Sequence, residues 1–200
     1  MPNDPPLILP RAVLFDMDGT LTEPMLDFPL IKQEMGIGGR PILEALAEMP
    51  PAERAAAEAV LLRHEERAAA HCRLNPGCHA VLDWLRARGV LTALITRNSP
   101  LSVNTVVRRH RLPLETLITR DDGPFKPDPH PLRLACRKLG VTEAQAWMVG
   151  DGQYDIEAAT AAGMKSVWIS HGRPKPFDAE AWRTMPDLLA LLNLLERCDA

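Results

Sequence analysis

Five short apolar runs recur along the chain, and none of them alternates apolar and polar residues as a half-exposed strand does. Each run is rich in Val, Ile or Leu and ends in a polar residue or glycine. This pattern is typical of strands that are buried on both faces of a parallel sheet. We therefore predict five strands, at Arg11–Asp16, Val90–Thr96, Thr116–Thr119, Ala146–Gly150 and Lys165–Ser170.

Helical segments with clear ends separate the strands that follow the first crossover. Their ends are marked by N-cap residues before proline and by glycine at the C-terminus. The clearest segments are Cys78–Arg88, one opened by Ser99-Pro100, one from Asp128-Pro129 to Gly140, and a last amphipathic helix at Asp187–Arg197. Strands that alternate with helices predict an α/β fold, a doubly wound Rossmann-like parallel sheet with right-handed crossovers.

The first crossover breaks this rhythm, because no strand candidate occurs between Thr22 and about Pro76. This stretch is far longer than one crossover helix requires, and its second half is rich in the helix formers Ala, Glu, Leu and Arg. Three helices are predicted in it, at about Phe28–Met35, Arg40–Met49 and Pro51–Cys72. We therefore expect a core domain made of residues 1–21 and 77–200, and an inserted helical cap subdomain at 22–76.

Composition narrows the class of protein. The chain is 46% hydrophobic and 24% charged, as a soluble globular protein is, and its net charge of −3 argues against a nucleic-acid partner. No apolar run reaches the length needed to span a bilayer, and the first residues lack the basic start of a signal peptide. Four cysteines at irregular spacings make no disulfide framework, so we expect reduced thiols and a cytoplasmic location.

Acidic residues follow two of the predicted strands. Asp16 and Asp18 end the first strand and face the same way, because strand residues alternate with a period of two. Asp151 and Asp155 follow the fourth strand, one helical turn apart. Carboxylates that converge on one point repel each other and need a cation, and oxygen ligands of this kind suit Mg²⁺.

A phosphate site is indicated beside these carboxylates. Thr96, Arg97 and Asn98 follow the second strand and lead into a helix N-terminus, where hydroxyl and N–H groups bind anions. Lys126 is a single cation in a proline-stiffened loop after the third strand. Together these residues predict a site for a divalent cation and a phosphate next to a nucleophilic carboxylate.

The order of these residues resembles the four motifs of the haloacid dehalogenase superfamily. The first is Asp16-Met17-Asp18-Gly19-Thr20, the second Thr96, the third Lys126, and the fourth Gly150-Asp151 through Asp155. More narrowly, the chain resembles the phosphatase branch with a small helical cap, as in phosphoglycolate-phosphatase-like proteins, over about residues 11 to 172. All four motifs in order make a strong signal, whereas any one alone would be weak.

The resemblance implies a role for each residue. Asp16 would attack phosphorus to form an aspartyl-phosphate, and Asp18 would protonate the leaving oxygen and then activate water. The Asp16 and Asp151 side chains and the Asp18 backbone carbonyl would bind Mg²⁺. Asp155 would not bind the ion itself but would hold the surrounding residues in position. Thr96 and Lys126 would bind the phosphoryl oxygens.

Three departures from the family pattern stand out. Arg97 intervenes between Thr96 and Asn98, where it either adds a cation beside Asn98 in the phosphate site or points to solvent. Gly152 stands where the family usually has Ser or Thr. The insertion is short for the phosphoglycolate branch, so that substrate is not carried over. Within the insertion, Lys32 and Arg40 are the candidates to contact the far end of a substrate.

The sequence therefore predicts a Mg²⁺-dependent phosphatase that acts on a small phosphorylated metabolite, with no membrane or nucleic-acid partner. A phosphomutase of the same superfamily is the nearest alternative, because it uses the same pair of aspartates. A non-catalytic phosphate-binding or interaction protein is a third possibility, although such proteins commonly lose one aspartate and this chain has Asp16 and Asp18. The substrate and the oligomeric state stay open.

Overall fold

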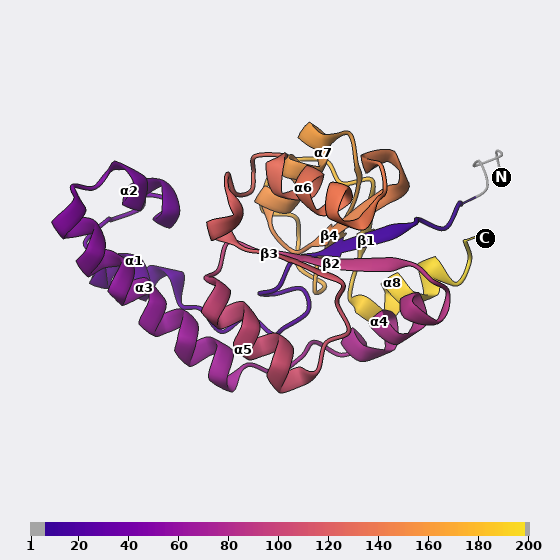
Figure 1. Ribbon diagram of the computed structural model, residues 1–200, viewed down its shortest axis with the longest axis horizontal. Helices are drawn as coiled ribbons and strands as arrows, with labels where there is room; N and C mark the ends of the chain where they lie inside the picture. The colour runs from indigo at the N-terminus through magenta and orange to yellow at the C-terminus, as the bar shows by residue number, and fades with distance from the viewer. Residues whose placement is uncertain (1–6, 199–200) are drawn as a thin grey trace.

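The computed structural model describes residues 7–198, and a six-stranded parallel sheet lies at its centre (Figure 1). The strand order is β3-β2-β1-β4-β5-β6, and every neighbouring pair is parallel. The strands are β1 (Ala12–Phe15), β2 (Leu91–Ile95), β3 (Thr116–Ile118), β4 (Ala146–Gly150), β5 (Lys165–Ile169) and β6 (Arg183–Met185). The predicted α/β fold is confirmed, and the order of the strands reverses between β1 and β4, which is where such sheets bind ligands.

Strand β1 shows why the apolar runs do not alternate. Val13 and Phe15 pack into one hydrophobic cluster, and Ala12 and Leu14 pack into another on the opposite face of the sheet. In Figure 1, α6 and α7 lie above the sheet and α4, α5 and α8 lie below it. The helices above are α6 (His130–Leu139) and α7 (Gln153–Ala162), and those below are α4 (Cys78–Ala87), α5 (Pro100–His110) and α8 (Leu188–Leu195). Both faces of the sheet are therefore covered, so every position of β1 has to be apolar.

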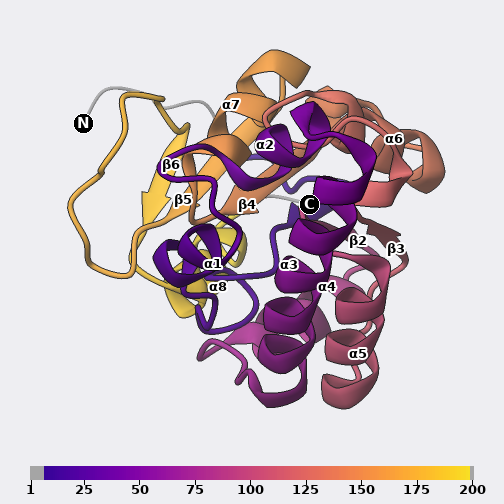
Figure 2. The ribbon, with the colours of Figure 1, turned by 90° about the vertical axis from the view of Figure 1, so that its left-hand side faces the viewer.

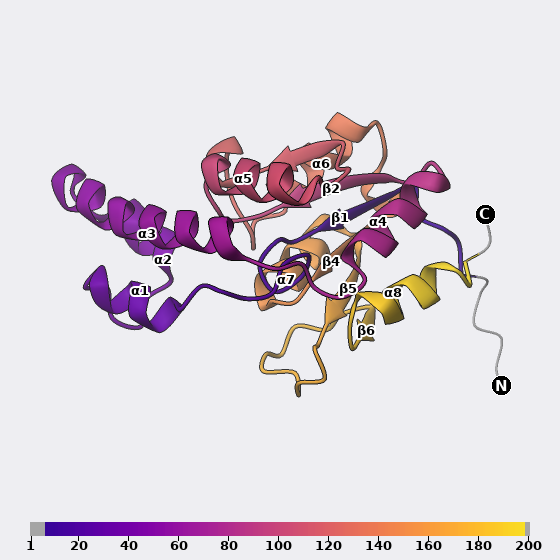
Figure 3. The same cartoon turned by 90° about the horizontal axis from the view of Figure 1, so that it is seen from below.

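Three helices lie beyond the sheet, on the side of the carboxyl end of β1 (Figures 1 and 3). They are α1 (Phe28–Glu34), α2 (Ile42–Glu48) and α3 (Pro51–His71), called the inserted helices below. Side chains such as Ile31, Leu46 and Leu61 form a hydrophobic cluster of their own, separate from the two clusters on the sheet. Helix α3 also packs along α5, and Figure 2 shows the inserted helices in front of the sheet.

The two connections to the inserted helices lie side by side. Thr22 forms an antiparallel bridge with Leu74, and the side-chain amide of Asn75 donates to the carbonyl oxygens of Thr20 and Thr22 at 2.8 and 3.0 Å. Asn75 is buried, so these hydrogen bonds are shielded from water. The chain thus leaves the core a few residues after Asp18 and returns to it at Leu74 and Asn75, next to the point where it left.

The structure differs from the sequence prediction in a few elements. Strand β6 was not predicted, because it has only three residues, pairs with a single neighbour and contains no run of apolar side chains. Short 3-10 turns occur at Arg120–Asp122 and Glu143–Gln145. The predicted helix ends agree within two residues, which is the usual uncertainty at fraying ends. Within residues 7–198, no helix combines the length and the apolar character needed to cross a membrane.

Candidate active site

Three carboxylates meet at the point where the strand order reverses. Asp16 follows β1, Asp151 follows β4, and Asp155 lies in the first turn of α7. One ligand oxygen of each lies within 4.8 Å of the others. The backbone holds this arrangement, because Asp16 N donates to the carbonyl oxygen of Val149 at 2.9 Å. The strand register therefore brings together residues that are about 135 positions apart in the chain.

Two glycines make room for these carboxylates. Gly19 has φ of +81°, and a β-carbon at that position would collide with the carboxylate of Asp151. A β-carbon at Gly150 would collide with the side chain of Asp155. Any larger residue at either position would push an acidic side chain out of the cluster.

Lys126 lies between two of the carboxylates. Its Nζ donates to Asp16 Oδ1 and to Asp155 Oδ1, each at 2.6 Å, and to the carbonyl oxygen of Ile95 at 2.7 Å. The side chain is buried, which by itself would lower its pKa, but the Asp155 and Asp16 carboxylates outweigh burial and raise the pKa of Lys126. Lys126 is therefore a permanent cation inside the cluster.

Burial also raises the pKa of the acidic groups. Removal from water raises the pKa of Asp16 well above its usual value, against the opposing effect of Lys126. Burial raises the pKa of Asp18 to about 6, although a hydrogen bond from Asn98 favours the charged form. The pKa of Asp151 is raised by burial and then by the neighbouring Asp155. One lysine does not offset this much negative charge, so the cluster favours a bound cation.

The residues after β2 approach the first acidic loop. The side-chain amide of Asn98 donates to Asp18 Oδ2, and the backbone N–H of Asn98 donates to Thr96 Oγ1 at 3.2 Å. Both side chains are buried. In the structure, Thr96, Asn98 and Lys126 thus lie close to Asp16 and Asp18. The sequence analysis predicted that these residues would be neighbours.

Arg97 does not point to solvent. Its Nη2 donates to both carboxylate oxygens of Glu44 in α2, at 2.9 and 2.7 Å, and its Nη1 donates to the carbonyl oxygen of Lys126 at 2.5 Å. The guanidinium also lies over the rings of Phe125 and Tyr154, 4.7 and 4.5 Å from their centroids. Arg97 therefore connects the core to the inserted helices.

A second carboxylate of the inserted helices reaches the start of α5. Glu65 is only 2% exposed, pairs with Arg120 Nη1, and accepts a hydrogen bond from Ser99 N at 3.2 Å. The sequence predicted an anion site at this helix N-terminus, and in the structure a carboxylate of the chain itself occupies the Ser99 N–H. No sequence signal marked Glu65, since acidic residues are common on helix surfaces.

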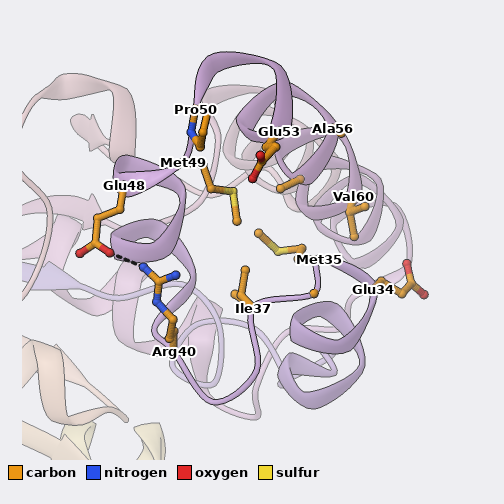
Figure 4. Close-up of a pocket in the computed structure, with 12 residues that line it drawn as sticks. Glu34, Met35, Ile37, Arg40, Glu48, Met49, Pro50, Glu53, Ala56 and Val60 are labelled. Atoms are coloured by element: carbon orange, nitrogen blue, oxygen red, sulfur yellow. Dashed lines mark hydrogen bonds and ion pairs between the residues drawn. The ribbon is translucent and has the colours of Figure 1, made fainter.

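The two cation candidates of the insertion lie apart from the carboxylate cluster. Arg40 pairs with Glu48, and Lys32 Nζ donates to the carbonyl oxygen of Gly39 at 3.4 Å. Arg40 lines an open pocket of about 690 Å³ whose lining residues belong to the inserted helices and the loops between them, and none of the clustered aspartates lines it (Figure 4). Met35, Ile37 and Met49 point into this pocket (Figure 4).

Sequence reasoning missed two residues that follow β5. Arg173 Nη2 lies 3.2 Å from Asp151 Oδ2, and His171 Nε2 lies 2.6 Å from the carbonyl oxygen of Gly19. His171 has φ of +52°, in the left-handed region that few residues other than glycine adopt. The carboxyl end of β5 lies at the same edge as those of β1 and β4, so the position of this loop was the available signal.

Comparison with protein families gives one match of more than half the chain. A family model described as haloacid dehalogenase-like hydrolase matches residues 30–163. This range contains Thr96, Lys126, Asp151 and Asp155, whereas Asp16 and Asp18 precede it.

Two relatives and one solved structure extend this match over most of the chain. A phosphoglycolate phosphatase of Pseudomonas putida is 32% identical over 94% of this chain and 80% of its own length. An N-acetylmuramic acid 6-phosphate phosphatase of Pseudomonas aeruginosa is 30% identical over 86% of each chain. The crystal structure of a hydrolase from Pseudomonas syringae has a TM-score of 0.77 at 22% identity, over 94% of this chain and 99% of that one.

Proposed function

The chain belongs to the haloacid dehalogenase-like hydrolases, and we propose that it is a Mg²⁺-dependent phosphatase of a small phosphorylated metabolite. One observation carries the proposal: Asp16, held by buried Lys126, shares a cluster with Asp151 and Asp155 where the strand order reverses. The two relatives described above, which act as phosphatases by name, support the same reaction.

The donor set of the cluster fits Mg²⁺. It consists of carboxylate oxygens only, and Gly19 and Gly150 leave space for carboxylates where any side chain would collide with them. Asp16 and Asp151 would hold the ion, together with the backbone carbonyl of Asp18. Asp155 accepts from Lys126 with one oxygen and from Gly152 N with the other, at 2.6 and 3.1 Å, which suits a bracing role. When bound, Mg²⁺ offsets the repulsion between the carboxylate and the phosphate dianion.

The first step is attack by Asp16 on phosphorus. Lys126 fixes Oδ1 of Asp16, so the proposed nucleophile is Oδ2. A bond forms between this oxygen and phosphorus, and the bond from phosphorus to the leaving oxygen breaks. Thr96 would donate to the phosphoryl oxygens, with Asn98 positioned beside it, and the charge of Lys126 would stabilise the negative charge on these oxygens. The product is an aspartyl-phosphate and an alkoxide that needs a proton.

Asp18 supplies that proton. Because burial raises its pKa to about 6, the carboxyl is partly protonated near neutral pH and is a suitable general acid. The resulting carboxylate then takes a proton from water, whose oxygen attacks phosphorus and releases Asp16 and inorganic phosphate. The hydrogen bond from Asn98 orients Asp18 in both steps.

We also propose that residues 22–76 form a cap that excludes water and selects the substrate. Both connections of this segment lie next to Asp18, and Glu44 and Glu65 attach it to the core beside Thr96 and Asn98. Lys32 and Arg40 stay proposed contacts for the far end of a substrate, and Asn98 stays a proposed contact on the phosphate side. Arg97, which the sequence placed beside Asn98, is paired with Glu44 instead.

The test is release of inorganic phosphate from p-nitrophenyl phosphate. We expect hydrolysis with Mg²⁺ and none in excess chelator, with recovery when Mg²⁺ is returned. Conversion of a sugar phosphate into an isomer without release of phosphate would favour the phosphomutase instead. Binding of phosphate without turnover of any ester would favour the non-catalytic alternative. Activity that persists in chelator would refute the role of the metal.

A further inference from the structure

We propose that Glu44 makes this chain select phosphomonoesters whose organic part is uncharged and bears hydroxyl groups, and reject those whose organic part carries a carboxylate. The inference rests on the proposed phosphatase function and specifies its substrate class. It follows from the partners of Arg97, which the sequence left as either a phosphate ligand or a surface residue.

The Arg97–Glu44 pair lies at the rim of the proposed site. Arg97 is between Thr96 and Asn98 in the chain, and its guanidinium contacts the carbonyl oxygen of Lys126 and the ring of Tyr154, the residue before Asp155. Glu44 projects from α2 on the opposite side, in the inserted helices. Because the inserted helices join the core next to Asp18, the proposal places the organic part of a bound phosphomonoester on their side of the site, beside this pair.

Arg97 already has a carboxylate partner within the chain. Its Nη2 already binds both oxygens of Glu44, and its Nη1 is used by the carbonyl oxygen of Lys126. The aromatic rings of Phe125 and Tyr154 hold the guanidinium plane in place. A substrate carboxylate could reach the Nη2 donors of Arg97 only by displacing Glu44, which would leave the Glu44 carboxylate without its partner.

The neighbouring cations are neutralised in the same way. Arg120 pairs with buried Glu65, Lys126 with Asp16 and Asp155, and Arg173 with Asp151. Each of these cations thus has a carboxylate partner from the chain itself. An additional carboxylate on a substrate would meet acidic groups and no unpaired cation among these four residues, which is unfavourable at short range.

Glu44 can instead accept hydrogen bonds from hydroxyl groups. Its side chain is 37% exposed, so it stays accessible while it binds Arg97. A carboxylate has lone pairs for about four hydrogen bonds, and Arg97 uses two of these sites. Glu44 therefore discriminates in two ways, by attracting hydroxyl donors and by repelling anions.

The experiment compares matched pairs of phosphomonoesters in which a hydroxymethyl group of one member is replaced by a carboxylate in the other. Glycerol 3-phosphate is compared with 3-phosphoglycerate, and 2-hydroxyethyl phosphate with phosphoglycolate, as kcat/KM ratios with Mg²⁺. We expect the wild type to prefer the uncharged member by about tenfold or more, and Glu44→Gln to reduce that ratio at least about fivefold by accelerating the carboxylate substrates.

Glu34→Gln is the matched control. Glu34 is a carboxylate of the inserted helices that is 35% exposed and pairs with Arg63 and His64, away from Arg97. This variant should keep the wild-type ratio. If Glu44→Gln does not fold by circular dichroism, the wild-type ratio alone decides.

A wild-type preference for the carboxylate members, or an unchanged ratio in Glu44→Gln, would overturn the inference while leaving the phosphatase function intact. Absence of hydrolysis of every ester, p-nitrophenyl phosphate included, would overturn the proposed function and this inference with it.

Discussion

Replacement of Asp18 by Asn should make the metal-free protein more stable while removing the proposed general acid. Burial raises the pKa of Asp18 from 3.8 to about 6, so the ionised carboxylate is disfavoured in the folded state. Two pKa units correspond to about 3 kcal/mol, and water at this partly exposed side chain screens part of it, so we expect a gain of about 1–3 kcal/mol. The amide of Asn98 can still donate to the oxygen of the new side chain.

The sign of this effect depends on pH. A group whose pKa is higher in the folded state stabilises the protein fully below its unfolded-state pKa, and this contribution is lost as pH rises through the folded-state value. The wild type should therefore lose the Asp18 contribution between about pH 4 and pH 6, where the folded state binds more protons than the unfolded chain. Asp18→Asn lacks this titration, so its advantage should grow over the same interval.

The assay is urea unfolding of both proteins in chelator, followed by circular dichroism from about pH 4 to about pH 8. Asp83→Asn, which removes an exposed carboxylate of α4, should differ little from the wild type at any pH. A variant Asp18→Asn that is less stable than the wild type at about pH 8 would refute the reasoning. A constant difference between the two proteins across the pH range would refute it as well.

Three further perturbations have defined outcomes. Asp16→Asn should abolish hydrolysis of p-nitrophenyl phosphate with an unchanged far-ultraviolet spectrum, because an amide cannot form the acyl-phosphate, and activity within about tenfold of the wild type would exclude Asp16 as nucleophile. Glu65→Gln should lower the free energy of unfolding by about 2 kcal/mol or more, because it leaves Arg120 without its buried partner. The control Glu66→Gln, at an exposed position, should change the free energy of unfolding by less than about 0.5 kcal/mol, and equal effects of the two variants would contradict this. Gly150→Ala should displace the side chain of Asp155 and reduce kcat at saturating Mg²⁺, and an unchanged kcat would show that the cluster tolerates the methyl group.

Much of the core could be predicted because the determinants are local. Five of the six strands within residues 7–198 show as short runs rich in apolar residues without alternation, since helices cover both faces of the sheet. Ala12 to Phe15 illustrate this most clearly. The acidic cluster could be predicted for a related reason. Parallel strands that end in Asp16 and Asp151 must present these residues at one edge, whatever the rest of the chain does.

Contacts between the inserted helices and the core could not be predicted in the same way. Whether Glu44 and Glu65 face solvent or Arg97 and Arg120 depends on how α2 and α3 are oriented over the site, and no periodicity in the sequence encodes that orientation. The short edge strand β6 was not predicted from the sequence because it lacks an apolar run. The contacts between the inserted helices and the core are thus the part of the structure that sequence patterns describe least.

In the proposed reaction, Asp16 carries the phosphoryl group during turnover. The most direct measurement is to quench the Mg²⁺-loaded enzyme during hydrolysis of an aryl phosphate, reduce acyl-phosphates with borohydride, and map the modified side chain by peptide mass spectrometry. We predict reduction of the Asp16 carboxyl to a primary alcohol, only when substrate is present. Modification at Asp18 or Asp151 instead, or turnover that leaves Asp16 unmodified under conditions that trap a known aspartyl-phosphate, would contradict the account.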